Sequence, residues 1–394
     1  MSRTRFVLTL IILGVAPYAA AQTASPPSSS EGAPRDLPLA RIDSLVGVEY
    51  AKDSLGSVTV GVVANGGLVW AKSYGYANRE RGVLATPATI YRIASVTKQF
   101  TALMLLQLVE RGRLHLSDGV ETYLPEIRRL RRRAPVGVPI SFAQLATMTA
   151  GLEGEPAGAE RYNVGPARVW EQQLLASLPE LAILWEPGSR FNYSNTSYAV
   201  LAAALSRVAG EPYVVYVERH ILAPLGMGQT RFTPDARMRA ALAKGYHLEG
   251  GTLDTLTPLR EHAGRGKNLP AGGLYSTVGD LARFVTFELG DGPAGVLRRA
   301  TLDSVFAGLV AADADLNYGE GIGFSALRRL PSAFVALGHV GQLTGYRSAV
   351  LFHRASRTGV IVLTSGTGAT GPTPKGADFQ EVAQEILALL VGPE

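Results

Sequence analysis

The sequence predicts an α/β fold of the α+β kind: one antiparallel sheet built from both ends of the chain, flanking helices, and an inserted all-helical domain. Three observations predict it. β-rich runs lie at 57–78 and again at 318–365, segments with helical spacing lie outside both runs, and the region between the runs is mostly helical in pattern. Strands separated by such a helical block indicate a single sheet to which both chain ends contribute.

The chain begins with the pattern of a secretory signal peptide. Arg3 and Arg5 precede an apolar run of 11 residues, and small residues then lead to an expected cleavage site after Ala21. A membrane span needs about 18 or more apolar residues, so this run is too short for a good anchor. We expect a periplasmic or secreted protein, with no stable membrane anchor after cleavage of 1–21. Residues 22–38, rich in Pro and Ser, predict a flexible linker.

The elements follow in order along the mature chain. Helical spacing extends over 39–54, and Asn65-Gly66-Gly67 then joins two β-rich runs, which is a hairpin signal. An apolar helix is expected from Ser95 to Gly112, and a final amphipathic helix over 377–391. The expected domains are an α/β sheet domain of 39–110 and 266–394 and a helical domain of 111–265.

Composition excludes several function classes. The chain contains no cysteine, which rules out thiol catalysis and thiolate metal sites, and its six histidines form no H-E-x-x-H motif. We therefore expect no metal and no cofactor. The net charge of +5 is too small to indicate nucleic-acid binding, and the basic cluster RRLRRR at 128–133 is interpreted as a solvated loop.

Ser95 and Lys98 stand three residues apart in the stretch SVTK, at the start of the first apolar helix. One interpretation is an N-cap serine followed by a surface lysine, since serine is a favoured cap. The other is a nucleophile beside its base, because side chains at i and i+3 share one face of a helix. A serine N–H at a helix N-terminus is also suited to stabilise an oxyanion.

Two further short motifs lie downstream. Tyr193 and Asn195 flank Ser194 just before another apolar helix, and His339 and Gly341 lie on or beside a β-strand. A glycine in a strand lets a ligand approach the backbone closely. Taken alone, each motif is better explained by an ordinary loop or turn.

Together, in this order and spacing, Ser-x-x-Lys at 95–98, Tyr-x-Asn at 193–195 and His-x-Gly at 339–341 resemble the signatures of the serine β-lactamase and penicillin-binding-protein superfamily. The resemblance is to its class C branch, which includes class C β-lactamases, DD-carboxypeptidases, D-amino-acid amidases and β-lactamase-fold esterases. It extends over roughly 40–390 and implies a β-lactamase/transpeptidase-like fold.

The resemblance implies a serine acyl-enzyme. Ser95 would attack an amide or ester carbonyl while Lys98 and Tyr193 move its proton, and Tyr193 would then help activate the water that releases the acyl group. Unperturbed lysine and tyrosine side chains both have a pKa of about 10. Burial of Lys98, or a cation beside Tyr193, must therefore lower one of these two pKa values. Which residue is the general base stays open.

Four further roles follow from the same resemblance. Asn195 would orient the lysine and a substrate amide. The oxyanion hole would consist of the backbone N–H groups of Ser95 and Gln342. His339 would replace the more usual lysine of the third motif, contributing a hydrogen bond or a positive charge near the tyrosine, and Gly341 would keep the strand backbone open to substrate.

Thr344 and Arg347, just past the third motif, complete the expected substrate-binding residues. Both could bind a substrate carboxylate through charge-assisted hydrogen bonds. An equal alternative is that Arg347 is a strand-edge surface residue. Met148 and Ala150, in LATMTAGL, stand where many relatives carry polar residues, and we expect this departure to affect packing more than chemistry.

We therefore expect an exported serine acyl-hydrolase with a small-molecule or peptide substrate: a peptidoglycan peptide, a β-lactam or an ester. Histidine in the third motif favours DD-peptidase-like or esterase-like activity over a dedicated β-lactamase. The alternative is a catalytically silent penicillin-recognising or peptidoglycan-sensing module. We expect a monomer, although the sequence leaves the oligomeric state open.

Overall fold

The computed structural model describes residues 37–52, 54–133, 139–155, 158–249, 251–307, 310–313, 318–328, 335–367 and 378–392. The expected signal peptide and nearly all of the expected linker lie outside these residues. From Leu37 onward the chain forms one compact unit.

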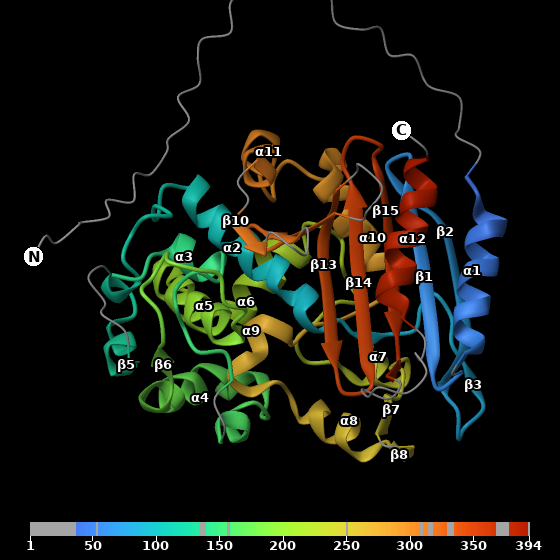
Figure 1. Ribbon diagram of the computed structural model, residues 1–394, viewed down its shortest axis with the longest axis horizontal. Coiled ribbons are helices and arrows are strands. Elements are labelled where there is room, and N and C mark those ends of the chain that lie inside the picture. The colour runs from blue at the N-terminus through green and yellow to red at the C-terminus, as the bar shows by residue number, and fades with distance from the viewer. Residues whose placement is uncertain are drawn as a thin grey trace, which may run out of the picture. The chain divides into compact units, whose positions relative to one another are not determined.

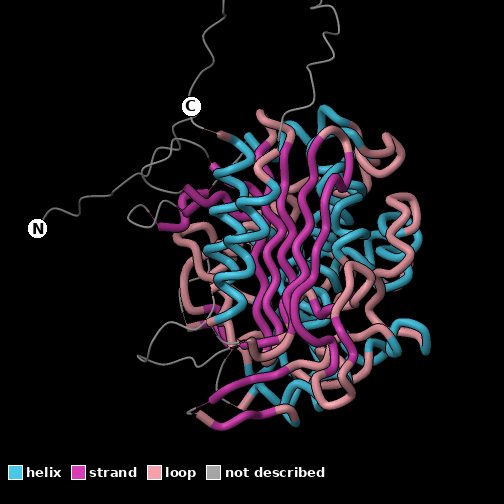
Figure 2. Tube along the Cα trace, turned by 90° about the vertical axis from the view of Figure 1, so that its right-hand side faces the viewer, coloured by secondary structure: helices cyan, strands magenta, loops and turns pink. Residues whose placement is uncertain are grey.

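A nine-stranded antiparallel sheet is the centre of the fold, and both ends of the chain contribute to it, as predicted (Figures 1 and 2). Strand β1 (Ser57–Ala64) is buried along its whole length, between β2 (Gly67–Asn78) and β15 (Thr358–Thr364). The strand order is β10-β11-β12-β13-β14-β15-β1-β2-β3. The remaining strands of this sheet are β3 (Val83–Leu84), β10 (Val310–Asp313), β11 (Tyr318–Glu320), β12 (Ser325–Arg328), β13 (Val335–Leu343) and β14 (Tyr346–His353).

The predicted hairpin joins β1 to β2. Asn65 and Gly66 have φ values of 51° and 80°, so both central residues of the turn are left-handed. This is the conformation of a type I′ turn, whose twist matches that of the two strands it connects. Asn and Gly are the residues that adopt it most readily, which explains why the hairpin could be predicted from sequence.

Two terminal helices cover one face of the sheet. Helices α1 (Leu39–Ala51) and α12 (Phe379–Val391) pack there against Val58, Val60 and Val62 of β1. Val63 belongs instead to the core on the opposite face. Successive side chains of a strand point to opposite faces of its sheet. Strand β1 therefore contributes side chains to the cores on both faces of the sheet.

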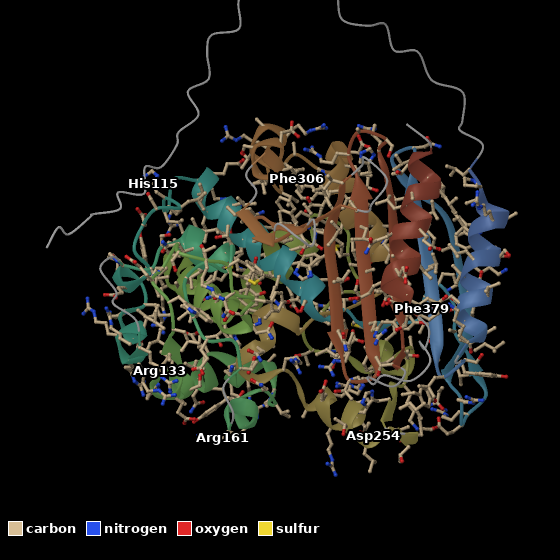
Figure 3. All side chains as sticks on the ribbon, viewed as in Figure 1. His115, Arg133, Arg161, Asp254, Phe306 and Phe379 are labelled. Carbon is tan, nitrogen blue, oxygen red and sulfur yellow. The ribbon has the colours of Figure 1, made fainter. Side chains whose placement is uncertain are left out.

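The helical region packs against the other face (Figure 3). Helix α2 (Thr97–Glu110) is buried on nearly every side, as expected of a helix that is apolar all round. Helix α5 (Asn195–Ala209) begins at the N-cap Ser194 and ends at Gly210, which has a φ of 70°. The other helices are α3 (Phe142–Ala146), α4 (Trp170–Ser177), α6 (Tyr213–Val217), α7 (Ala236–Ala240), α8 (Leu256–Arg260), α9 (Leu269–Gly272), α10 (Val278–Thr286) and α11 (Arg299–Ala307).

The inserted region departs from the all-helical expectation. Strands β7 (Tyr246–Glu249) and β8 (Thr252–Asp254) form a small sheet with β16 (Gly366–Thr367), which lies parallel to β7. The partner β16 comes from the far end of the chain, so the local pattern could not reveal it. Short two-stranded pairs also join β4 (Tyr91–Arg92) to β9 (Tyr275–Ser276), and β5 (Arg131–Arg132) to β6 (Ala182–Ile183).

No single helix among the described residues is long and apolar enough to cross a membrane. The segments Asn195–Ala209 and Tyr213–Leu222 meet that criterion only as a pair, and the pair is bent by 79°.

Candidate active site

Ser95 lies in a short 3₁₀ turn, η1 (Ala94–Val96), that leads directly into α2. The α-helix therefore begins at Thr97, two residues later than expected. Ala94 has a φ of 47°, a left-handed conformation that is uncommon for a residue with a Cβ. A backbone conformation of this kind persists only where the surrounding structure holds it in place, and it is often found at functional sites.

Four of the expected site residues come together around the hydroxyl of Ser95. Lys98 Nζ lies 3.1 Å from Ser95 Oγ, and Tyr193 Oη lies 2.9 Å from the same oxygen. Lys98 Nζ also donates to Asn195 Oδ1 at 2.8 Å. Although Tyr193 is 98 positions from Ser95 in the sequence, both proton-carrying groups reach one oxygen atom.

Lys98 is completely buried, yet its ammonium group is well supplied with acceptors. Besides Ser95 and Asn195, Nζ donates to the carbonyl oxygen of Ala271 at 3.1 Å. These three acceptors match the three N–H groups of a protonated lysine. The rings of Tyr193 and Tyr198, with centroids 4.8 and 5.6 Å from Nζ, add favourable cation–π contacts. The arrangement therefore fits the charged form of Lys98.

Sequence reasoning missed Ala271. The segment AGGLYSTVGDLARF resembles the family, but a backbone carbonyl has no side-chain signature that would mark it as a partner of Lys98.

Alternating hydrogen bonds orient the segment that carries Tyr193 and Asn195. The side chains on either side of these two residues bind the loop at 152–154, while Tyr193 Oη contacts Ser95 and Asn195 Oδ1 contacts Lys98. Asn192, Ser194 and Thr196 donate side-chain hydrogen bonds to the carbonyl oxygens of Leu152, Glu153 and Gly154, at 2.8, 3.2 and 3.0 Å respectively.

The departure at Met148 has a structural role in the same region. Met148 is buried, has a φ of 54°, and its carbonyl oxygen accepts from the N–H of Asn192 at 2.9 Å. The residue thus supports the segment before Tyr193 through its backbone and its apolar side chain.

His339 is buried on β13, with 3% of its surface exposed. Burial, reinforced by the positive charge of Lys98, lowers the pKa of His339 to about 3. Its imidazole is therefore uncharged at neutral pH, so the expected alternative of a positive charge is not supported. Nδ1 lies 2.5 Å from the carbonyl oxygen of Val340, which can only accept, so Nδ1 carries the proton and Nε2 is an acceptor.

Gly341 places β13 directly against the turn that holds Ser95. A Cβ on Gly341 would lie 2.5 Å from the carbonyl oxygen of Ile93, so a side chain does not fit there. The same carbonyl oxygen accepts from Ser348 Oγ of β14 at 2.8 Å. These contacts hold the strand and the turn together.

The backbone N–H of Gln342 is available for the expected oxyanion hole. Gln342 stands opposite Arg347 in the β13–β14 register, and the N–H of Arg347 donates to Thr364 Oγ1 on the other side, at 3.2 Å. Opposite residues of an antiparallel pair are either both bonded to each other or both turned away. The N–H of Gln342 therefore points away from β14.

Arg347 does not face the site. Its neighbour Tyr346 points toward the helical region, where Tyr346 Oη donates to the carbonyl oxygen of Ala243 at 2.7 Å. Because side chains alternate along a strand, Arg347 lies on the opposite face, which α12 covers. Arg347 is therefore not a residue of the substrate site, and it is not at a strand edge either, because β14 lies between β13 and β15.

Thr344 is engaged by a carboxylate of the chain itself. Thr344 Oγ1 donates to Glu261 Oε1 at 3.2 Å, and Glu261 Oε2 accepts from Arg92 Nη1 at 2.8 Å. Arg92 is almost fully buried, which makes this ion pair a fixed part of the fold. The hydroxyl that was expected to bind a substrate carboxylate is thus already occupied.

Metal ligands do not gather in the described part of the chain, since no group of three or more His, Asp or Glu side chains is close enough to hold an ion there.

This fold has known counterparts. The model of the Beta-lactamase family matches residues 42–385. The chain belongs to the Beta-lactamase family. Solved structures with the same fold include class C beta-lactamases, a D-alanine carboxypeptidase and a D-amino acid amidase.

Relatives of this Beta-lactamase family protein carry the names of different kinds of protein. A Bacillus subtilis (strain 168) protein with the name penicillin-binding protein PbpX is 32% identical over 235 residues, 60% of this chain and 55% of that protein. The octameric penicillin-binding protein homologue from Pyrococcus abyssi is 26% identical with a TM-score of 0.74, covering 91% of this chain and 78% of that one. EstCE1, a hydrolase with promiscuous acyltransferase activity, shares the fold at 22% identity and a TM-score of 0.74, covering 90% and 98%. The chain spans about half the length of the curated relatives it matches, with 55%, 58% and 48% in three of them.

Proposed function

We propose that this protein is an exported serine acyl-hydrolase, which forms an acyl-enzyme on Ser95 from an amide or ester substrate. The observation that carries the proposal is that Lys98 and Tyr193 both hydrogen-bond to Ser95 Oγ, at 3.1 and 2.9 Å. A hydroxyl becomes an effective nucleophile when an adjacent group takes its proton. Membership of the Beta-lactamase family and the hydrolases among its structural neighbours support this class of reaction.

In the acylation step, Ser95 Oγ forms a bond to the carbonyl carbon while its proton passes to the oxygen of Tyr193. The hydrogen bonds to Lys98 favour its ammonium form, and a cation beside a phenol favours the phenolate. We therefore assign Tyr193 as the general base. The N–H groups of Ser95 and Gln342 stabilise the oxyanion. The bond to the leaving group then breaks, and the leaving group takes the proton from Tyr193.

Deacylation reverses these roles. Water attacks the acyl carbon as its proton passes to Tyr193, and the proton returns to Ser95 Oγ when the acyl group departs. Lys98 stays charged throughout, held by Asn195 and Ala271, and stabilises the phenolate form of Tyr193.

The surroundings of the site favour an ester-like substrate. Thr344 is bonded to Glu261 and Arg347 lies on the far face of the sheet, so neither of the two groups expected to bind a carboxylate serves that role. This favours a carboxylesterase-like substrate over a DD-peptide that ends in a free carboxylate. β-Lactam hydrolysis and a silent penicillin-recognising module are the outcomes to be distinguished by experiment.

The test compares the mature protein with its Ser95→Ala variant on three probes. These are a short-chain nitrophenyl ester, a chromogenic cephalosporin and a fluorescent penicillin. We expect ester turnover that depends on Ser95. Turnover of the cephalosporin would indicate a β-lactamase, and stable penicillin labelling without turnover would indicate a penicillin-recognising protein. Ester turnover that persists in Ser95→Ala would refute the proposed nucleophile.

A further inference from the structure

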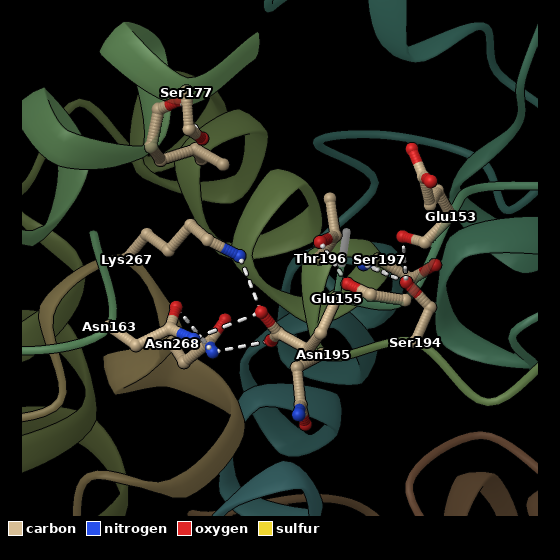
Figure 4. Close-up of polar contacts among 12 residues, drawn as sticks. Glu153, Glu155, Asn163, Ser177, Ser194, Asn195, Thr196, Ser197, Lys267 and Asn268 are labelled. Atoms are coloured by element: carbon tan, nitrogen blue, oxygen red, sulfur yellow. Dashed lines mark hydrogen bonds and ion pairs between the residues drawn. The ribbon is translucent and has the colours of Figure 1, made fainter. Parts of the chain in front are cut away.

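Glu155 is the centre of a polar cluster beside the start of α5. Figure 4 shows its carboxylate between Lys267 and Asn268, with Asn195 close by. The carboxylate accepts from Lys267 Nζ at 3.3 Å, from Asn268 Nδ2 at 2.6 Å and from Asn163 Nδ2 at 3.0 Å. Lys267 and Asn268 are almost completely buried, whereas 35% of the Glu155 side chain is exposed.

The ion pair between Glu155 and Lys267 forms with both groups charged. Burial acts to raise the pKa of Glu155, but the charge of Lys267 and the amide donors outweigh it and hold that pKa below its usual value. A buried ammonium without a partner is strongly destabilising. Glu155 therefore stays ionised and keeps Lys267 in place.

The cluster connects two walls of the candidate active site. On one side, Glu155 directly follows Glu153 and Gly154, whose carbonyl oxygens bind Ser194 and Thr196 around the Tyr193–Asn195 segment.

On the other side, Lys267 and Asn268 directly precede α9, whose Ala271 carbonyl accepts from Lys98. The two walls thus supply Asn195 Oδ1 and the Ala271 carbonyl oxygen, both of which hold Lys98. The side chain of Glu155 links the two walls, because it extends from the first wall and accepts hydrogen bonds from Lys267 and Asn268 of the second.

We propose that Glu155, through Lys267 and Asn268, is a positioning residue that fixes Tyr193 and Asn195 relative to Ala271 around Lys98. The proposal rests on the proposed serine hydrolase function. Catalytic groups must be held within about 0.5 Å of their productive geometry. Residues 155 and 267 are 112 positions apart, so their ion pair fixes the distance between two segments that the backbone leaves independent.

The test uses two variants and a matched control. Glu155→Gln removes the charge that neutralises Lys267, and Asn268→Leu removes one amide donor while it keeps the ion pair. The control is Glu171→Gln, because Glu171 pairs with Arg207 at 2.7 Å near the other end of the same helix α5. Should Glu155→Gln fail to fold, Asn268→Leu carries the test.

The measurement is single-turnover acylation by a nitrophenyl ester, expressed per titrated active site. We expect both cluster variants to lower the acylation rate roughly 10- to 100-fold, because small displacements of catalytic groups have effects of that size. We expect KM to change by less than about twofold, since binding is not the step affected. The Glu171→Gln control should acylate at the wild-type rate.

A second background separates positioning from general destabilisation. If Glu155 acts through Tyr193, then Glu155→Gln should cost little further activity in a Tyr193→Phe protein, because coupled effects are not additive. An equal loss in both backgrounds, or a loss seen only in KM, would overturn the inference while Ser95 remains the nucleophile. Activity that survives Ser95→Ala would instead overturn the proposed function itself.

Discussion

Gly341 of β13 lies against Ala94, the residue before the proposed nucleophile: a Cβ on Gly341 would be 2.9 Å from the Cβ of Ala94. Any side chain at 341 must therefore push the strand away from the turn. The contact fixes β13 beside this turn, and the proposed oxyanion hole requires the N–H groups of Gln342 and Ser95 to keep a fixed separation.

Gly341→Ala should for this reason impair acylation far more than folding. We expect a loss of roughly 10²- to 10³-fold in acylation rate, the effect of removing one oxyanion donor. The free energy of unfolding should fall by about 1–3 kcal/mol, as for other overpacked sites. Gly47→Ala, where the added Cβ meets nothing within 4 Å, is the control. Wild-type acylation by Gly341→Ala would contradict this account of the contact.

The left-handed backbone of Ala94 predicts a steep dependence on residue type. Ala94→Gly should be tolerated, because glycine adopts a φ of 47° without strain. Ala94→Val should lower the free energy of unfolding by about 2 kcal/mol or more, since a β-branched residue is strained at positive φ. Thermal unfolding and active-site titration of the two variants test this, and a stable, active Ala94→Val protein would show that the turn is not constrained.

Glu288 predicts an alkaline loss of stability. Its side chain is buried, lines a small cavity with Gln99, and burial raises its pKa from 4.5 to about 8 despite the attraction of Arg354. The unfolded chain releases this proton near pH 4.5 and the folded chain only near pH 8, so the free energy of unfolding falls as the pH rises through this window.

Glu288→Gln removes that dependence. We expect it to be more stable than the wild type at pH 8 by several kcal/mol, at about 1.4 kcal/mol for each unit of pKa difference, and to differ little at pH 4.5. Urea unfolding at both values measures the effect, and the exposed Glu186→Gln serves as the control. An equal gain at both pH values would show that the carboxyl is not held protonated.

The neutral state of His339 predicts the shape of the pH–activity profile. Since the pKa of His339 lies at about 3, the imidazole does not titrate between pH 5 and 8 in the folded protein. The profile of kcat/KM over that range should therefore keep its shape in His339→Gln. A change of the acidic limb in this variant would show that the histidine carries a charge during turnover.

The lowered pKa of His339 also predicts a contribution to acid unfolding. Because the folded-state pKa of His339 is lowered, the unfolded chain binds a proton below pH 6.5 that the folded chain cannot accept. The free energy of unfolding should fall from pH 6.5 toward pH 3, and less so in His339→Gln. Thermal unfolding at pH 7 and pH 4.5 measures the difference.

Local patterns were enough to predict the elements that depend on local chemistry. The Asn65-Gly66 hairpin follows from the left-handed preference of these residues, and Ser95 with Lys98 from helical spacing. The side of the sheet on which Arg347 lies could not be predicted, because a shift of one residue in register moves every side chain of a strand to the other face. Nor could the sequence pair Thr344 with Glu261, or Glu155 with Lys267, since these partners are 83 and 112 positions apart.

The interior position of β1, between β15 and β2, also determines when the sheet can be completed. The N–H of Ser57 at the start of β1 bonds to Ser365 Oγ at 3.0 Å, across 308 positions of sequence. While the chain is still being synthesised, β1 has β2 as a partner on one side and an open edge on the other. Contacts between such distant segments form slowly, because a long loop must close first. A newly made chain therefore remains without its finished sheet until β15 has left the ribosome.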